Sequence, residues 1–117
     1  MIPQKVPSIF DMIKNYFDLE NIVLDLSKYR PGMILPWHSD TYPTYSKNMN
    51  INDTNKIVRI IVFLHDANPG EQLWIEDKFC IGQAGSWFSW TGKTEHMAAN
   101  LGKSDRYVIQ LTGVIKN

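Results

Sequence analysis

The sequence has 117 residues, with 12 basic and 12 acidic side chains, so its net charge is close to zero. A chain of this length builds one hydrophobic core more readily than two, and we expect a single domain over residues 1–117. The charge balance offers no basic stripe of the kind that binds phosphate backbones, so nucleic acid is not an expected partner. No apolar run approaches the roughly 18 residues of a membrane-spanning helix, so we expect no membrane partner.

The cysteine count and the first residues indicate the compartment. The one cysteine, Cys80, cannot form an internal disulfide, and the sequence after Met1 lacks the long apolar core of a signal peptide. We therefore expect a reducing, cytoplasmic setting, in which Cys80 is a structural residue.

The first predicted element is an amphipathic helix within residues 7–19. Its apolar residues recur at spacings of three and four, and Ser8 is placed to act as the N-cap. The rest of the chain alternates in short runs rich in β-branched and aromatic residues, which is typical of strands. Strands are expected at residues 22–26, 33–37, 57–64, 73–75, 86–90 and 106–114, and a further strand is expected around residue 96.

The connections between these strands carry turn residues, as in RPG, TGKTE and NLGKSD, and none is long enough to hold a crossover helix. Neighbouring strands should therefore pair antiparallel. One helix followed by six to eight short antiparallel strands predicts a mainly-β fold, a sandwich or a squat double-sheet roll. One connection, residues 41–55, is long and polar, and connections of this length are usually lids or binding loops.

The three histidines, His38, His65 and His96, allow the candidate metal sites to be enumerated. His38 and Asp40 are two residues apart, which on a strand places both side chains on one face. His65 and Asp66 are adjacent and would point to opposite faces. The third ligand is then His65 or His96, and the turn and strand around His96 favour it. Two histidines and one carboxylate suit Fe(II) with open coordination positions, and catalytic zinc accepts the same set.

Arg106 favours the Fe(II) site over the zinc site. It follows His96 by ten residues and begins the last predicted strand, where alternation places it on one face with Val108, Gln110 and Thr112. An arginine that faces the interior of a small roll is costly unless an anion pairs with it. A guanidinium binds a carboxylate through two parallel hydrogen bonds, so Arg106 is the candidate to hold the far carboxylate of a 2-oxo acid that chelates iron.

The order His-x-Asp, a distal histidine and an arginine ten residues later resembles the Fe(II)- and 2-oxoglutarate-dependent oxygenases built on the double-stranded β-helix. The tail GSWFSWTGKTEHMAANLGKSDRYVIQLTG is similar to the end of prolyl-hydroxylase-like members, and the resemblance covers residues 29–113. It implies a jelly-roll, cupin-like fold in which His38, Asp40 and His96 bind iron and Arg106 binds the C5 carboxylate of 2-oxoglutarate. The implied activity is hydroxylation of a C–H bond with O2, by analogy on a peptide side chain such as proline.

Further residues are assigned to the cosubstrate with the help of this resemblance. Some aspartyl/asparaginyl-hydroxylase-like members place an arginine on a strand comparable to residues 57–64, which makes Arg59 a candidate. Several relatives carry a serine two residues after the final arginine, where this chain has Val108, so Tyr29 and Thr112 are substitutes by position. The face of the strand opposite Arg59 is aliphatic and is expected to pack under the N-terminal helix.

Two other hypotheses remain open. A cupin-type metalloenzyme that needs no oxo acid would require a His-x-His opening and a nearby glutamate, neither of which this sequence offers. A jelly-roll binding module without metal chemistry would use aromatic side chains as a carbohydrate or peptide face. We expect the tryptophans to pack in the core and at its rim instead: Trp37, Trp74, Trp87 and Trp90. The expected partners are 2-oxoglutarate, a peptide or small-molecule substrate, and a second copy of the chain in a homo-oligomer.

Overall fold

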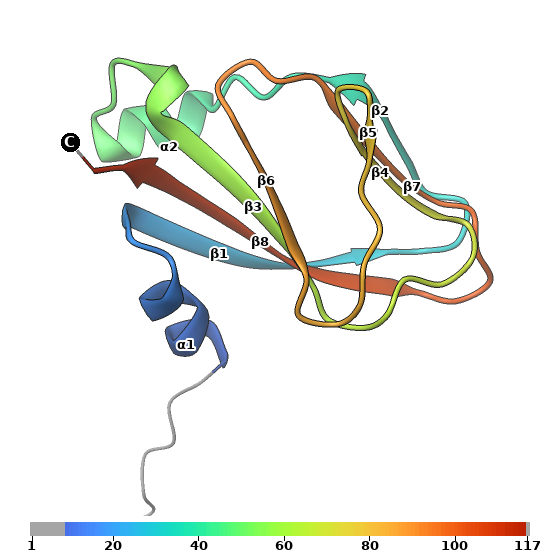
Figure 1. The fold of residues 1–117 in the computed structure, drawn as a ribbon. Coiled ribbons are helices and arrows are strands. Elements are labelled where there is room, and N and C mark those ends of the chain that lie inside the picture. Colours follow the sequence, from blue (N-terminus) through green and yellow to red (C-terminus); the bar gives the residue numbers. More distant parts are fainter. Residues whose placement is uncertain (1–8, 117) are drawn as a thin grey trace, which may run out of the picture.

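The computed structural model describes residues 9–116, which form a roll of two β-sheets (Figure 1). Two short helices, α1 (Ile9–Tyr16) and α2 (Pro43–Met49), and one 3-10 turn, η1 (Thr54–Lys56), accompany the strands. The strands of the described residues are β1 (Leu19–Tyr29), β2 (Ile34–His38), β3 (Ile57–Phe63), β4 (Glu71–Ile75), β5 (Lys78–Phe79), β6 (Trp87–Thr91), β7 (His96–Asn100) and β8 (Arg106–Ile115). The mainly-β class expected from the sequence is confirmed.

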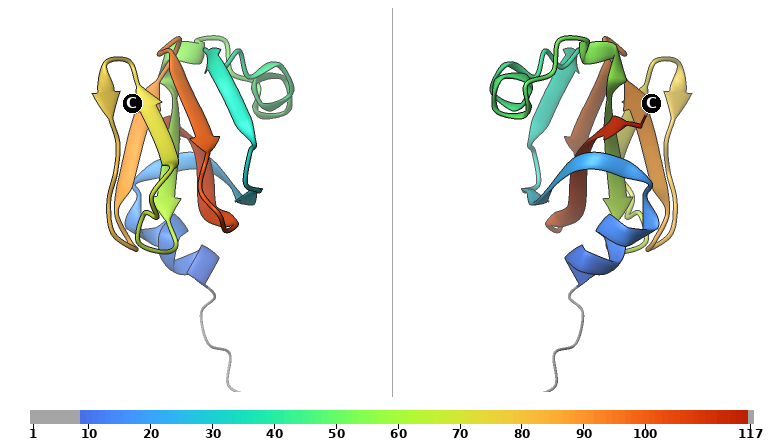
Figure 2. Two further views of the ribbon diagram at one scale, coloured as in Figure 1. Left: turned by 90° about the vertical axis from the view of Figure 1, so that its right-hand side faces the viewer. Right: turned by 90° about the vertical axis from the view of Figure 1, so that its left-hand side faces the viewer.

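The strands form two four-stranded sheets, which face each other in Figure 2. Sheet A has the order β1-β8-β3-β6, and sheet B has the order β2-β7-β4-β5. All strand pairs are antiparallel, as the short connections predict. Because β1 pairs with β8 and β2 pairs with β7, each sheet joins segments from both halves of the chain.

Strand β3 presents two faces to two different clusters of the core. On one face Val58, Ile60 and Val62 pack with Ile109 and Leu111 of β8, and we refer to these five residues as the aliphatic cluster. The partly buried residues that cover it come from α1, from β1 and from the residues directly after α1 and β3: Ile13, Phe17, Leu19, Ile22, Leu24 and Leu64. The expected packing of the N-terminal helix on this face is confirmed, although β1 shares the cover.

The opposite face of β3 turns toward the space between the sheets. Ile61 and Phe63 of this face pack in the inter-sheet cluster, which is completed by Leu73, Cys80, Trp90 and Val108. Cys80 is 6% exposed, in agreement with a structural role. Arg59 lies on the same face of β3, so a charged side chain is carried by the strand that builds the core.

Helix α1 is shorter than the sequence predicts. It ends at Tyr16 because the chain at Leu19 already pairs with Ile115 in sheet A. The expected N-cap, Ser8, lies outside the described residues. No helix within residues 9–116 is long and apolar enough to cross a lipid bilayer.

The long polar connection at residues 41–55 contains helix α2, so it is not a loop throughout. Pro43 occupies the first turn, where its fixed φ is favourable and its missing N–H costs nothing. Tyr42 and Asn50 close the two ends in the left-handed region, with φ of 51° and 55°. The hydroxyl of Tyr45 donates to the carbonyl of Asn21 at 2.6 Å, which ties α2 to β1.

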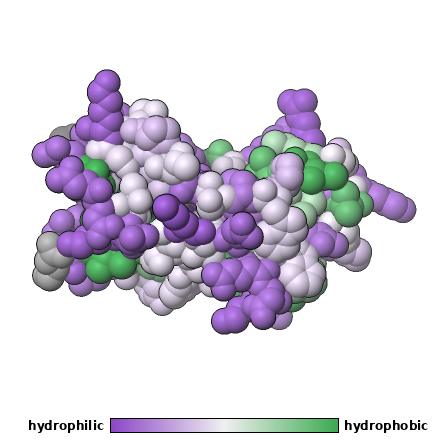
Figure 3. Space-filling view, turned by 90° about the horizontal axis from the view of Figure 1, so that it is seen from above, coloured by the Kyte–Doolittle hydropathy of each residue, from purple (hydrophilic) through white to green (hydrophobic). Residues whose placement is uncertain are grey.

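Seen from above in Figure 3, the surface is mostly hydrophilic. Hydrophobic side chains gather mainly at the end of this face where the strands of sheet B lie in Figure 1. The exposed apolar side chains of this face are thus concentrated at sheet B.

Candidate metal centre

Strands β2 and β7 bring two histidines side by side. His38 and His96 are cross-strand partners, and their ring centroids are 4.3 Å apart. The register of β2 shifts between Leu35 and His38, and such a bulge re-aims the side chains beyond it. Both of these β2 residues therefore line the same cavity. Asp40 lies past the end of the strand and turns back to the two histidines.

The candidate ligand atoms of His38, Asp40 and His96 all lie within 4.8 Å of one another. Nε2 of His38 is 3.5 Å from Oδ1 of Asp40, and Nε2 of His96 is 3.4 Å from Oδ2. The Nδ1 atoms contact the carbonyl oxygens of Pro36 at 2.6 Å and Thr94 at 3.0 Å. Since a carbonyl only accepts, each Nδ1 carries the proton, and Nε2 of the neutral ring presents a lone pair.

This arrangement places acceptor atoms against acceptor atoms. The Nε2 lone pairs of both histidines face the carboxylate of Asp40, which is favourable only when a cation or a proton lies between them. Two imidazole nitrogens and one carboxylate oxygen are a known ligand set for divalent transition metals, and the Nδ1–H···O=C bonds are the outer contacts that fix metal-binding rings. The residues present therefore fit a divalent metal ion.

Three further side chains orient the carboxylate of Asp40. Nε1–H of Trp90 and the hydroxyl of Tyr42 each donate to Oδ2 at 3.3 Å. Nη1 of Arg59 is 3.6 Å from the same oxygen, and the guanidinium lies over the Tyr42 ring, 4.8 Å from its centroid. Trp90 also packs against His96, with ring centroids 4.2 Å apart. These contacts hold one imidazole and the carboxylate in a defined geometry.

The two histidines differ in burial. The side chain of His96 is 7% exposed, against 40% for His38. Burial lowers the pKa of His96, and the Thr94 carbonyl and Asp40 oppose this more weakly, so the ring is neutral near pH 7, as a metal ligand requires. Burial also raises the pKa of the Tyr42 phenol, which keeps its proton and remains a donor to Asp40.

A cavity of about 110 Å³ between the sheets includes these residues. Its apolar wall is formed by Leu35, Ile61, Leu73, Ala98 and Val108. The other lining residues are aromatic, polar or charged: Tyr29, His38, Asp40, Arg59, Trp90, His96, Arg106 and Gln110. All the site residues predicted from the sequence except Thr112 therefore line one cavity.

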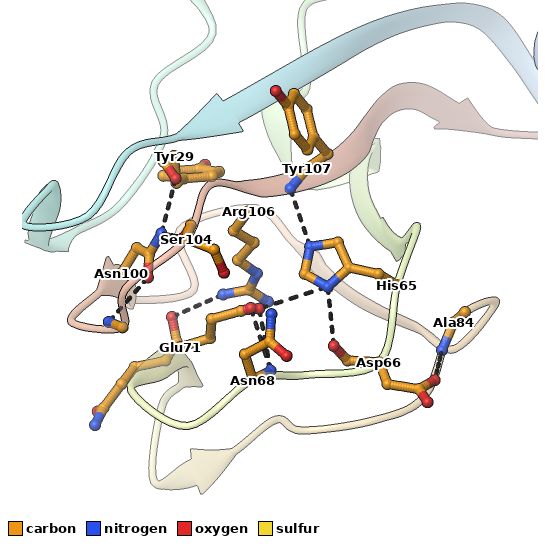
Figure 4. Close-up of polar contacts among 12 residues, drawn as sticks. Tyr29, His65, Asp66, Asn68, Glu71, Ala84, Asn100, Ser104, Arg106 and Tyr107 are labelled. Carbon is orange, nitrogen blue, oxygen red and sulfur yellow. Dashed lines mark hydrogen bonds and ion pairs between the residues drawn. The ribbon is translucent and has the colours of Figure 1, made fainter.

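Arg106 is buried in this cavity, with only 5% of its surface exposed. It donates from Nη1 to the carbonyl of Gln72 at 3.2 Å, and its guanidinium lies 4.7 Å from the ring centroid of Phe63. Figure 4 shows the guanidinium beside the carboxylate of Glu71. Burial lowers the pKa of Arg106, and the charge of Glu71 opposes that shift. One hydrogen bond to the backbone leaves other N–H donors for a ligand.

Tyr29 is the cross-strand partner of Arg106 and lines the cavity beside it. Burial raises the pKa of the Tyr29 hydroxyl, against the weaker effects of Arg106 and Arg59, so it is a donor near pH 7. Thr112 is buried opposite Arg59 in the β3–β8 register, but it is not among the residues that line the cavity. Gln110, two residues earlier in β8, lines the cavity in its place.

His65, the other candidate for the third ligand, has different partners (Figure 4). Its Nε2 accepts from the backbone N–H of Tyr107 at 3.3 Å. Its Nδ1 is 2.9 Å from the carbonyl of Asp66 and 3.8 Å from Oε1 of Glu71. Within residues 9–116, the side chains with metal-ligand spacing are those of His38, Asp40 and His96. His65 is not part of this group.

Sequence reasoning missed the contacts that Trp90 and Tyr42 make to Asp40. Trp90 lies in an alternating aromatic strand that is typical of core packing, and it does pack in the inter-sheet cluster. Its position opposite Arg59 depends on the β3–β6 register, which no local pattern in the sequence reveals. By contrast Trp37, next to His38, is 51% exposed at the rim.

No protein family model and no curated protein matches the sequence. Solved structures do match. KdgF from Halomonas sp. aligns at 17% identity with a TM-score of 0.56, covering 81% of this chain and 71% of that one. A predicted oxalate decarboxylase from Thermotoga maritima aligns at 14% identity with a TM-score of 0.56, covering 80% and 66%. A cupin protein from Bacteroides fragilis aligns at 13% identity with a TM-score of 0.55, covering 90% and 78%.

Identities this low show the fold alone. The two antiparallel sheets and these neighbours confirm the fold predicted from the sequence, whereas membership of the 2-oxoglutarate oxygenases stays a prediction. The chain has a cupin-like double-stranded β-helix fold that carries a His–Asp–His cluster with the spacing of a metal site.

Proposed function

We propose that this chain is an Fe(II)- and 2-oxoglutarate-dependent dioxygenase that hydroxylates a C–H bond of its substrate. The observation that carries the proposal is the convergence of two Nε2 atoms and one carboxylate, all within 4.8 Å of one another. Two histidines and one carboxylate leave coordination positions for a cosubstrate and O2. Fe(II) bound there would supply the O2 chemistry that side chains lack.

The charges of the cavity support an anionic cosubstrate. Arg59 and Arg106 line it, and the carboxylates beside them are those of Asp40 and Glu71. A divalent ion would therefore leave the cavity with a net positive charge. A dianion such as 2-oxoglutarate compensates this charge, with its oxo-acid end at the metal and its far carboxylate on Arg106.

Each residue has a defined part in this proposal. His38, Asp40 and His96 would hold the metal ion, with the ring orientations already set by backbone carbonyls. Arg106 binds the far carboxylate of 2-oxoglutarate, and Tyr29, its cross-strand partner in the same cavity, donates its hydroxyl to that carboxylate.

The proposed reaction consumes one O2 and one 2-oxoglutarate for each C–H bond converted. One oxygen atom enters the substrate as a hydroxyl group, the other enters succinate, and the C1 carboxylate leaves as CO2. The apolar wall of the cavity limits access of water to the reacting groups, and the fixed ligands contribute orientation.

A cupin-type metalloenzyme that uses no oxo acid is the second candidate. The solved structures favour it more directly than the dioxygenase, because those named by class are cupins and one is a predicted oxalate decarboxylase. Against it stands the ligand set itself, since Asp40 occupies the place where a His-x-His opening would have its second histidine. The metal-ligand group found in the described residues also includes no glutamate.

Anaerobic titration with Fe(II) and then 2-oxoglutarate tests the proposal. A 2-oxo acid chelated to Fe(II) gives a weak visible charge-transfer absorption, which the wild-type chain should develop and His96→Ala should not. Fe(II) binding without this absorption would favour the cupin candidate. The absence of Fe(II) binding would leave the jelly-roll binding module as the remaining hypothesis.

A further inference from the structure

Arg59 is a largely buried cation that lacks a matching partner. Its side chain is 19% exposed, and its buried Nε has no hydrogen-bond acceptor among residues 9–116. The carboxylate oxygen of Asp40 with which it pairs is 3.6 Å away, beyond normal hydrogen-bond length. The ring of Tyr42 stabilises the charge through its face, but it accepts no N–H in the plane of the guanidinium.

The carboxylate of Asp40 already interacts with other groups, so it is a weak partner for Arg59. Its Oδ2 already accepts hydrogen bonds from Trp90 and Tyr42, and its two oxygens face the Nε2 atoms of the histidines. As a metal ligand this carboxylate would also share its charge with the ion. A buried guanidinium with unmade hydrogen bonds costs stability, so the position favours an anion brought by a ligand.

The two arginines of the cavity have different interaction partners. Arg106 donates to the carbonyl of Gln72 and has the charge of Glu71 nearby. Arg59 contacts the carboxylate of the candidate metal centre, so it lies at the metal end of the cavity. If Arg106 holds the cosubstrate, Arg59 is the cation left for a second ligand beside the metal.

The cavity restricts the size of that ligand. The cavity volume of about 110 Å³ admits only a small ligand. Near Arg59 its wall includes the aliphatic side chain of Ile61, two residues along the same face of β3, and the Trp90 ring opposite. A planar carboxylate with a short aliphatic part matches both the guanidinium and this wall.

We infer that Arg59 binds the carboxylate of the substrate, and that the substrate is a small aliphatic monocarboxylic acid. The inference rests on the proposed function, because it assigns the substrate position beside the metal and the cosubstrate. It replaces the peptide side chain expected by analogy with a free acid, and it assigns Arg59 to the substrate instead of the cosubstrate expected from the resemblance.

Isothermal titration calorimetry of the full chain tests the inference with butyrate and its neutral isostere butyramide. Without added metal, the wild type should bind butyrate at least ~10-fold more tightly than butyramide, because only the carboxylate accepts two charge-assisted hydrogen bonds. Arg106→Gln, which removes the other carboxylate-binding candidate of the cavity, should keep this preference. Arg59→Gln combined with Arg106→Gln should remove it.

A second arm repeats the titration with Zn(II) and 2-oxoglutarate present, and the preference for butyrate should persist. If Zn(II) and 2-oxoglutarate both fail to bind while the metal-free titration still shows the preference for butyrate over butyramide, the proposed function fails and the role of Arg59 stands. Equal affinities for butyrate and butyramide in the wild type would overturn the inference. A preference that is lost in Arg106→Gln, or that survives when Arg59→Gln is added to Arg106→Gln, would also overturn it.

Two further measurements keep the test decisive. If Arg59→Gln does not fold by circular dichroism, Arg59→Met replaces it; this variant removes the charge, keeps an apolar side chain of similar length and should lose the preference. Inorganic phosphate is the competing anion. Phosphate binding as tight as that of butyrate would contradict a site for a monocarboxylate.

Discussion

The two faces of strand β3 hold different kinds of residue, although they alternate along seven positions. Val58, Ile60 and Val62 pack in the aliphatic cluster, and no charge interrupts that face. Arg59 and Ile61 turn to the cavity, where a guanidinium lies within the wall of the core. Burial of such a group costs stability that the aliphatic face must offset. One side of β3 therefore carries only apolar packing, whereas the other combines the core packing of Ile61 and Phe63 with a charged residue of the candidate site.

The largest expected effect belongs to the aliphatic face. Leu111 is fully buried there, and Leu111→Ala should lower the free energy of unfolding by about 3 kcal/mol through lost burial and a residual cavity. Urea denaturation measures this loss. Metal affinity of the folded variant should stay within about twofold of wild type. A strongly reduced metal affinity in this variant would show that the two faces are coupled.

The next effect belongs to the cavity. Arg106→Gln should weaken 2-oxoglutarate binding by about 10- to 100-fold, because a charge-assisted pair is lost, while Fe(II) affinity stays close to wild type. Equilibrium titration of each ligand separates the two effects. Lys103→Gln, at an exposed position before β8, is the matched loss of charge and should change neither affinity. Wild-type affinity for 2-oxoglutarate in Arg106→Gln would remove this residue from its role.

A smaller effect is expected at Trp90, which contacts a candidate ligand without being one. Trp90→Phe removes the N–H donated to Asp40 and keeps an aromatic ring against His96, so metal affinity should fall by about 10-fold. Trp74→Phe is the control, because its N–H goes to Gln72 instead. Equal metal affinities for the two variants would argue against orientation of the carboxylate by Trp90.

The smallest expected effect is on the pH dependence of native stability, through Cys80 of the inter-sheet cluster. Burial raises the pKa of the Cys80 thiol, so the unfolded chain ionises first as the pH rises. Native stability should therefore decline slightly above the unfolded thiol pKa of about 8.5, and Cys80→Ala should remove that part of the decline. Urea denaturation across this pH range measures the difference. A decline of equal size in both proteins would assign it to other groups.

The candidate ligands could be found from the sequence because few histidines are present and their spacing to Asp40 and Arg106 is a linear property. Alternation on a strand predicts that His38 and Asp40 share one face, but in the structure Asp40 lies beyond the end of β2 and a bulge re-aims His38. The bulge depends on pairing with β7, which a local pattern does not encode.

The parts that the sequence did not predict depend on long-range register or on weak local signals. Helix α2 has no apolar stripe, so only Pro43 marks its start. The place of Trp90 opposite Arg59 follows from the β3–β6 pairing. Thr112 shares alternation with Arg106 and lies opposite Arg59, yet it does not line the cavity, where Gln110 does so.

The central claim is that His38, Asp40 and His96 form one metal site. Titration of the full chain with Co(II), followed by visible absorption, tests it without a cosubstrate. We expect saturable binding of one equivalent by the wild type and by His65→Ala, and at least ~100-fold weaker binding by His96→Ala, because a ligand and the geometry that it fixes are lost. Unchanged binding in His96→Ala, or no saturable binding in the wild type, would contradict the account.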